Sequence, residues 1–132
     1  MSKNAIQKVT LGCRLFLGLV FFVFGLNGFL NFIPVPPEMP EKAMKMMQAF
    51  MESGYFMQVV KGTEVIGGLM LLTGRFAPLG LIILAPVTVQ IFLFHAFTTP
   101  GLQNLIMPLF MIMLHLGAAH LYRDRFIPLL KP

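Results

Sequence analysis

The sequence predicts an all-α integral membrane protein, an antiparallel four-helix bundle with a short amphipathic helix in its first external loop. Of its 132 residues, 57% are hydrophobic and only 11% are charged, whereas soluble domains average about 45–50% and about 25%. No Asp, Glu, Lys or Arg occurs between Arg75 and Arg123. A chain of this length favours one domain, so residues 1–132 are interpreted as a single membrane domain.

The first spanning helix is expected at about residues 11–33. It contains the charge-free run LFLGLVFFVFGLNGFLNFI, which starts at Leu15. A bilayer core about 30 Å thick needs about 20 apolar helical residues. Lys3 and Lys8 precede the run, as in a signal peptide, but the run is too long and no A-x-A site follows it, so we interpret it as a membrane span.

The charge-free stretch after Arg75 predicts two further spans. As one helix it would be about 70 Å long, so it must fold back, and the Pro and Gly of the TTPG segment at 98–101 break the helix. With a second span at about 55–74, this gives a third at about 76–97 and a fourth at about 104–122. Residues 123–132 form a cytoplasmic tail.

The loop at 34–54 combines prolines with a second helical pattern. The prolines that keep its start extended are Pro34, Pro36, Pro37 and Pro40. The polar face of the following helix is expected to hold Glu41, Lys45, Gln48 and Glu52, and the apolar face Ala43, Met46, Met47 and Phe50. We expect this helix to end at Gly54 and to lie on the outer membrane surface or to cap the bundle.

Lysine and arginine placement predicts that both termini are cytoplasmic, because cytoplasmic loops collect positive residues. The cations on that side would be Lys3, Lys8, Arg14, Arg75, Arg123, Arg125 and Lys131, against Lys42 and Lys45 on the other side. The net charge of +5 is therefore attributed to topology. No basic stripe with interleaved aromatic residues indicates nucleic-acid binding.

Lys61 and Glu64 are the main candidate site residues. Ionisable groups inside spanning helices are costly and often mark function, and residues three apart share one helical face. Two interpretations stay open: a self-neutralising pair that fixes packing or orientation, and a polar site for a ligand or a proton. Depth along the helices places Asn27, Asn31 and Gln90 in the same outer layer. This predicts a ligand pocket roofed by the Met-rich loop.

Other polar residues in the spans are expected to be structural. Arg14 is expected to extend to the cytoplasmic interface rather than to pair within the bundle. His95, His115 and His120 do not have the spacing of a chelating set, so we predict interfacial or hydrogen-bonded histidines and no metal site. The loop methionines could hold Cu(I), but adaptable apolar packing is the preferred interpretation.

Small residues and the single cysteine are also assigned to packing. Gly18 and Gly25, and likewise Gly67 and Gly74, are seven apart and would place small residues on one side of the first two spans. Cys13 has no cysteine partner, which argues against a bundle that passes electrons to quinone through its own thiols.

Three segments together resemble the DoxX family of small bacterial membrane proteins. They are RLFLGLVFFVFGLNGFLNF from Arg14, KGTEVIGGLMLLTGRFAPLGLIILAP from Lys61, and FLFH ending at His95. The resemblance implies a four-helix protein of the bacterial cytoplasmic membrane, with Glu64 as the family's acidic residue of the second helix. Relatives include a subunit of an archaeal thiosulfate:quinone oxidoreductase and a mycobacterial protein associated with thiol and superoxide detoxification enzymes.

Three hypotheses for function follow, and the sequence does not decide whether the protein is an enzyme. The first is a membrane subunit or assembly partner in a redox or oxidative-stress system, with a protein partner or a homo-oligomer in the bilayer, because no complete catalytic constellation is found. The second is a quinone- or lipid-binding component, in which Lys61, Gln90 and Asn27 bind a head group and Glu64 handles a proton. The third, transport of a small solute or metal, is disfavoured because four helices with few polar residues make a poor pore.

Overall fold

The computed structural model describes residues 1–36 and 38–132, and helices are the only regular secondary structure in this part of the chain. The elements are α1 (Lys3–Leu30), α2 (Glu41–Glu52), α3 (Phe56–Thr73), α4 (Ala77–Thr98), η1 (Leu102–Leu105), α5 (Ile106–Leu121), α6 (Arg123–Phe126) and η2 (Ile127–Leu130). Four helical segments, one of them η1 and α5 combined, are long and apolar enough to cross a membrane. The predicted all-α membrane bundle is confirmed.

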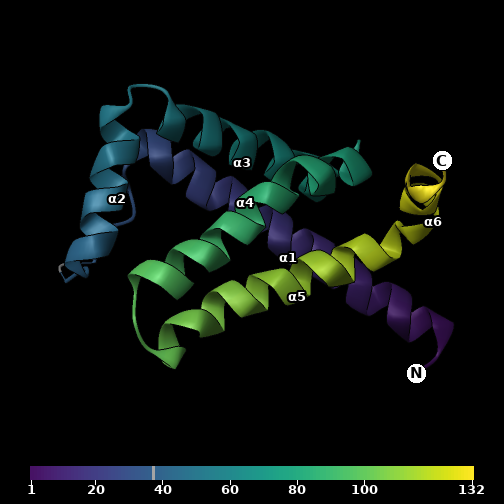
Figure 1. The fold of residues 1–132 in the computed structure, drawn as a ribbon. Helices are drawn as coiled ribbons and strands as arrows, with labels where there is room; N and C mark the ends of the chain where they lie inside the picture. Colours follow the sequence, from purple (N-terminus) through teal and green to yellow (C-terminus); the bar gives the residue numbers. More distant parts are fainter. Residues whose placement is uncertain (37) are drawn as a thin grey trace.

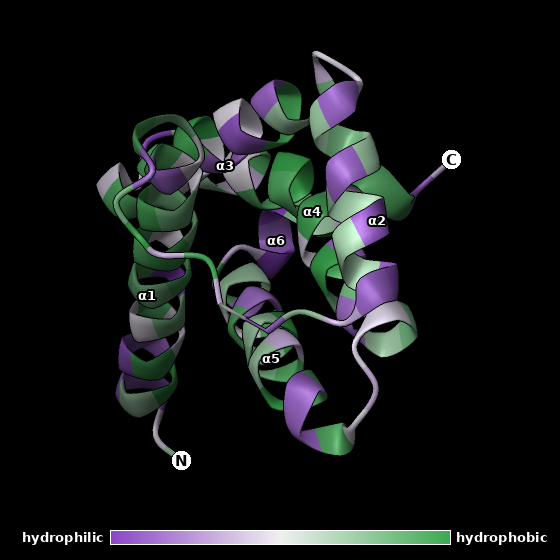
Figure 2. Ribbon diagram, turned by 90° about the vertical axis from the view of Figure 1, so that its left-hand side faces the viewer, coloured by the Kyte–Doolittle hydropathy of each residue, from purple (hydrophilic) through white to green (hydrophobic). Residues whose placement is uncertain are grey.

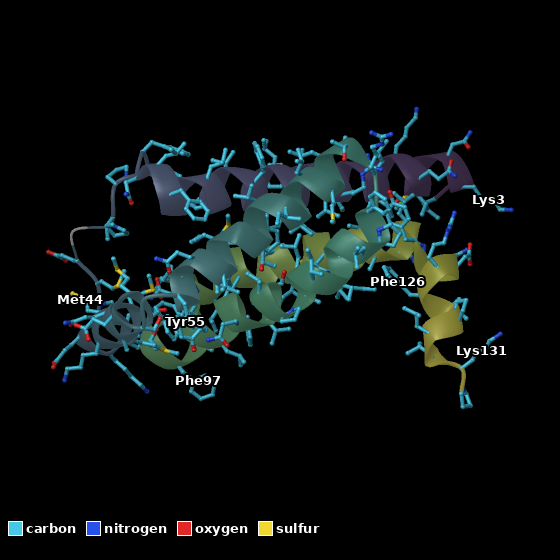
Figure 3. All side chains as sticks on the ribbon, turned by 90° about the horizontal axis from the view of Figure 1, so that it is seen from above. Lys3, Met44, Tyr55, Phe97, Phe126 and Lys131 are labelled. Atoms are coloured by element: carbon cyan, nitrogen blue, oxygen red, sulfur yellow. The ribbon has the colours of Figure 1, made fainter. Side chains whose placement is uncertain are left out.

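The four long helices form a closed ring. α1 packs against α3 and α5, and α4 packs against the same two helices. In Figure 1, α1 and α4 run towards α2, whereas α3 and α5 run away from it, so the neighbours are antiparallel. Both termini therefore lie at the end of the bundle opposite α2, and Figure 3 shows Lys3 and Lys131 far from Met44 and Tyr55.

Leucine, phenylalanine and methionine side chains fill the centre of the ring. Leu17 and Phe21 of α1 meet Leu71 of α3, Leu84 of α4 and Leu114 of α5 there, and all five are buried. Apolar residues also cover much of the outer surface of the long helices, and the ribbon of these helices is largely green, the colour of hydrophobic residues, in Figure 2. Apolar residues on both faces are the pattern of helices that pack inward and contact lipid outward.

Glycines bring α1 and α3 into close contact. A Cβ atom added at Gly68 would lie 2.6 Å from the backbone nitrogen of Phe22, and one added at Gly18 would lie 2.8 Å from the Cβ of Leu71. Gly25 packs in the same way against Val65. The second predicted glycine pair is corrected: Gly67 packs against Leu84 of α4, whereas Gly74 ends α3 in the left-handed conformation, with φ 74°.

α2 is amphipathic as predicted and packs against α3 and α4. Its apolar face points to the bundle, where Ala43 is fully buried. On its exposed face Lys45 forms an ion pair with Glu41 at 2.7 Å, and the Gln48 amide donates to Glu52 at 2.7 Å. The helix ends at Glu52, before the expected Gly54. The prediction for Pro37 falls outside the described residues.

The ends of α1 differ from the expected span. The helix starts at Lys3, capped by the Ser2 hydroxyl, which accepts from the Ala5 amide at 3.2 Å. It stops at Leu30, because Asn31 adopts the left-handed conformation with φ 52°. The predicted break between the last two spans is present: α4 ends at Thr98, and the single turn η1 leads into α5.

Candidate functional site

Glu64 and Lys61 form an ion pair inside the bundle. The Lys61 Nζ atom lies 3.0 Å from Glu64 Oε2, and the side chains are 21% and 5% exposed. Lys61 and Glu64 fit against α1 because that helix has glycines at the two positions where a side chain would collide with them. A Cβ at Gly25 would lie 3.0 Å from the Cβ of Glu64, and one at Gly28 would collide with the aliphatic stem of Lys61. Packed helices therefore shield most of the pair from the surroundings of the bundle.

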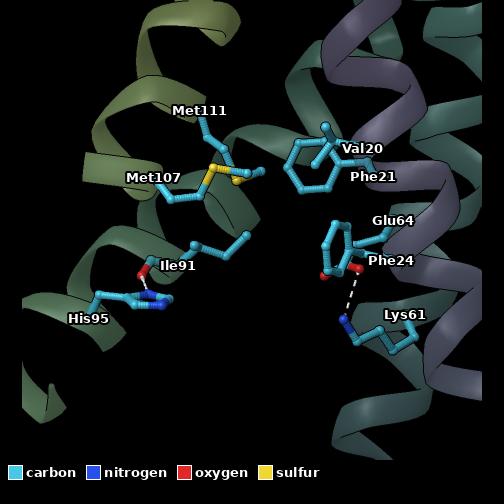
Figure 4. Close-up of a pocket in the computed structure, with 9 residues that line it drawn as sticks. All are labelled: Val20, Phe21, Phe24, Lys61, Glu64, Ile91, His95, Met107 and Met111. Carbon is cyan, nitrogen blue, oxygen red and sulfur yellow. Dashed lines mark hydrogen bonds and ion pairs between the residues drawn. The ribbon is translucent and has the colours of Figure 1, made fainter. Parts of the chain in front are cut away.

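The ion pair lines a cavity of about 260 Å³ to which all four long helices contribute (Figure 4). α3 supplies Lys61 and Glu64 on one side, and α4 and α5 supply the opposite side. Its lining residues are Val20, Phe21, Phe24, Lys61, Glu64, Ile91, His95, Met107 and Met111. The cavity thus combines a few polar groups with aromatic, aliphatic and thioether walls.

A second cavity, of about 570 Å³, continues from the first towards α2. The two share Lys61, Glu64, Ile91 and His95. Gln90 joins the polar groups here, and Met47 and Phe50 of α2 contribute to the wall. The structure therefore brings Lys61, Glu64 and Gln90 to one continuous space beneath the Met-rich loop.

His95 is the polar residue of this space that the sequence analysis placed outside the candidate pocket. Its Nδ1 atom lies 2.8 Å from the carbonyl oxygen of Ile91. A carbonyl only accepts hydrogen bonds, so Nδ1 carries a hydrogen, and in the neutral form of the ring Nε2 has a lone pair. Helical periodicity could have found His95, because Leu84, Thr88 and Ile91 continue one α4 face to it.

The model of the DoxX family matches residues 9–96. The chain belongs to the DoxX family. The match runs from Val9 in α1 through α2 and α3 to Ala96 in α4, and so contains Glu64, Lys61 and His95. Met107 and Met111, which α5 contributes to the DoxX cavity, lie beyond it. The comparisons with curated proteins and with solved structures gave no match.

Asn27 and Asn31 have a structural position in this DoxX protein. The Asn27 side-chain oxygen accepts from the backbone amide of Ile33 at 2.6 Å, just after α1 ends. Asn31 is the exposed residue whose left-handed backbone stops the helix. Neither belongs to the lining of the two joined cavities. The structure thus leaves both asparagines outside the lining of the cavities that the Lys61–Glu64 pair faces.

Arg14 is half-buried and extends towards the end of the bundle where the termini lie. Its Nη1 atom donates to the Tyr122 hydroxyl at 2.8 Å, and the guanidinium lies against Gly74. Arg14 thus connects α1 with the end of α5 and the turn after α3. Cys13, beside it, packs against Gly117 of α5.

The two other histidines of the DoxX bundle lie away from the cavity. His115 is held between helices: its Nε2 donates to the Leu81 carbonyl at 3.1 Å, and its Nδ1 accepts from the Thr88 hydroxyl at 3.0 Å. His120 is exposed near the termini and contacts Arg123. Among the described residues, no group of three His, Cys, Asp or Glu could hold a metal ion.

The side chains that line the two joined cavities offer hydrogen-bond donors and acceptors. Among the described residues, no Ser, Thr or Cys lines the two joined cavities, so their walls offer no hydroxyl or thiol nucleophile. Glu64 can accept hydrogen bonds, Lys61 can donate them, and the neutral form of the His95 ring can accept one at Nε2. The arrangement is suited to a small head group with both donors and acceptors.

Proposed function

We propose that this DoxX protein binds the head group of a quinone in the cavity around Glu64 and acts as a membrane subunit of a redox or oxidative-stress system. The observation that carries the proposal is the ion pair of Glu64 and Lys61, which opens onto a cavity lined by all four long helices. Apolar walls with a few placed polar groups are typical of small-molecule sites.

The geometry favours hydrogen bonding to a ligand from two sides. The Lys61–Glu64 pair lies across the cavity from His95 (Figure 4). A hydroquinone has hydroxyl groups at opposite ends of its ring, which could donate to Glu64 and to His95 Nε2. A quinone carbonyl could accept from Lys61. The same groups would then be placed to take up the protons that a hydroquinone releases on oxidation.

The charge of the site favours a quinone over a phospholipid head group. The Lys61–Glu64 pair is neutral as a unit, and a phosphate would bring a second negative charge next to Glu64 at low dielectric. Glu64 also lies about 12 Å along α3 from its start at Phe56, below the level of phosphates. An uncharged quinone ring that lies among Phe21, Phe24 and Met107 would bring no second charge next to Glu64. It would also not have to reach the level of the phosphates.

The membrane-subunit part of the proposal follows from the chemistry of the lining. Among the described residues, none of the side chains that line the two joined cavities is a thiol or part of a disulfide that could exchange electrons. Oxidation or reduction of a bound quinone would need an electron donor or acceptor from outside these walls, and we propose that another protein supplies it. Gentle purification from the native membrane should recover such a protein in stoichiometric amount; recovery of the lone chain, under conditions that keep other complexes intact, contradicts this part.

Quinone binding is tested on the purified full-length chain. Isothermal titration with a short-chain quinone should give saturable binding, and organic extracts of the protein should contain quinone by mass spectrometry. Glu64→Gln should weaken binding about tenfold or more, because it removes a charged acceptor and leaves Lys61 unpaired. The matched control is Glu41→Gln, on the exposed face of α2, which should bind as the wild type does. Absence of quinone binding in the wild type, or equal losses in the two variants, would refute the proposal.

A further inference from the structure

A cavity of about 480 Å³ lies at the opposite end of the bundle, near the termini. The first two turns of α1, the last turn of α5 and the start of α6 surround it. Its polar lining residues besides Thr10 are Lys3, Asn4, Gln7, His120, Arg123 and Asp124. It shares no residue with the Glu64 cavities, so a ligand here would be independent of the quinone proposal.

The polar groups of this cavity are mainly hydrogen-bond donors. Lys3 and Arg123 are cations, and the amides of Asn4 and Gln7 add neutral donors. Arg123 Nη1 lies 3.2 Å from His120 Nε2, a contact that orients the guanidinium. Asp124 is the acid in the lining; its Oδ1 atom lies 3.8 Å from Arg123 Nε in an exposed ion pair, in which the Arg123 and Asp124 side chains are 61% and 89% exposed. Lys3 adds a second cation to this pair, which leaves the lining with a net positive charge. The balance of charge therefore favours an anion.

The length of α1 places this cavity at the membrane surface. The helix has 28 residues, which corresponds to about 42 Å, against a hydrocarbon core about 30 Å thick. The excess of about 12 Å corresponds to the first two turns, Lys3–Thr10, which hold Lys3 and Lys8. Those turns, and the cavity they line, would thus lie at the level of the lipid head groups.

The apolar part of the site continues towards the hydrocarbon core. Ile6 and Leu121 contribute apolar surface to the cavity. Further along the contact between α1 and α5, Phe16 and Phe110 meet edge to face with ring centroids 5.9 Å apart, and both remain partly exposed on the outer surface. A ligand with an anionic head and apolar chains could contact both parts.

From the cavity, its depth and its charge, we propose that it binds the phosphate group of an anionic phospholipid of the surrounding bilayer. Arg123 and Lys3 would contact the phosphate from α6 and α1, and the acyl chains would follow the outer surface where α1 meets α5. Basic pockets between membrane helices bind anionic head groups in this way. Bound lipid would join the start of the chain to its tail.

Native mass spectrometry of the detergent-purified chain tests the proposal. The chain should retain dioleoyl phosphatidylglycerol in preference to dioleoyl phosphatidylcholine, which has the same acyl chains and no net charge. The double variant Lys3→Gln/Arg123→Gln should bind phosphatidylglycerol about tenfold more weakly, since each cation near the surface contributes to binding. The control Arg125→Gln/Lys131→Gln removes the same charge at the same end from residues outside the cavity lining, and should bind as the wild type does.

Two further measurements separate the site from diffuse attraction and from free phosphate. Asp124→Asn, at an exposed position, should bind phosphatidylglycerol more tightly, because it removes the acid from the lining. Sodium phosphate at the concentration of the lipid should not displace it. Equal retention of the two lipids, equal losses in both double variants, no gain in Asp124→Asn, or displacement by phosphate would each overturn the proposal. Circular dichroism checks that the variants keep their helical structure.

Discussion

The ion pair of Lys61 and Glu64 makes each residue depend on the other. Both side chains are removed from most solvent, and Glu64 is 4% exposed as a residue. Removing a charge from water is costly, and the opposite charge offsets that cost only while both partners are present. Loss of one partner should therefore be worse than loss of both.

We expect Lys61→Met to lower the free energy of unfolding by about 3 kcal/mol, because it leaves a buried carboxylate unpaired. The double variant Lys61→Met/Glu64→Leu should recover most of this loss. Chemical unfolding in detergent, followed by circular dichroism, measures both. Lys45→Met, which breaks the exposed pair on α2, should change stability by less than about 1 kcal/mol. A double variant as unstable as the single one would show that the Lys61 stem, packed on Gly28, matters more than its charge.

His95 and His115 should respond differently to replacement by phenylalanine. His115→Phe removes hydrogen bonds to Leu81 and Thr88 in the core, and should cost about 1–3 kcal/mol of stability. His95→Phe removes an acceptor from the cavity and should weaken quinone binding while changing stability less. Titration calorimetry and unfolding on both variants check the contrast. The reverse pattern would place the ligand at His115 instead.

Sequence spacing predicts some of these positions and not others. The three-residue spacing of Lys61 and Glu64 is enough to place them on one face. Depth alone misplaces Asn27 and Asn31, because a local change of backbone conformation at the end of α1 decides where their side chains lie. The bond from Arg14 to Tyr122 joins helices far apart in sequence, so it depends on which helices are neighbours.

At the scale of elements, the contact of α1 with α3 depends on glycines. Gly68→Val should lower stability by about 1–3 kcal/mol, because the new side chain must push the Phe22 backbone away. Gly62→Ala, on the same helix, meets no atom within 4 Å, and should be neutral or stabilising by up to about 1 kcal/mol. Unfolding in detergent compares them. Equal effects of the two substitutions would mean that the close contact does not contribute.

The amphipathic pattern of α2 predicts both the helix and its apolar face, because polar and apolar residues recur along that segment with the period of an α-helix. It does not predict that Met47 and Phe50 reach a cavity shared with Lys61. That contact depends on the turn between α2 and α3, where Gly54 has φ 80°. Such a turn sets the direction of α2 relative to α3 without leaving a periodic signal in the sequence.

At the scale of the molecule, the distribution of cations predicts cytoplasmic termini. In a Cys13→Ser background, Gln48→Cys on α2 should react with a membrane-impermeant maleimide on intact cells. Lys131→Cys in the tail should react only after the membrane is permeabilised, because α2 and the tail lie at opposite ends of the bundle. Labelling of Lys131→Cys alone on intact cells would reverse the predicted orientation.

Length, apolarity and charge are enough to predict four spans, because each property is imposed by the bilayer. The order of helices around the ring is harder to predict. In lipid, the outward face of a helix is as apolar as its inward face, and α4 contains no Asp, Glu, Lys or Arg along its whole length. The cavity beside Glu64 depends on which helices are neighbours in the ring. The sequence could therefore indicate the polar residues of the cavity but not the apolar residues that surround them.

The glycines of α1 that pack against α3 also affect how the protein inserts into the bilayer during synthesis. α3 is the least apolar of the four spans by mean hydropathy, and it carries both Lys61 and Glu64. α1 leaves the ribosome first and presents Gly25 and Gly28 where those two side chains later pack. By packing against Lys61 and Glu64, α1 would then assist the insertion of α3 into the membrane. A truncated chain without α1 would risk leaving α3 outside the membrane, with α4 and α5 inserted in the wrong direction.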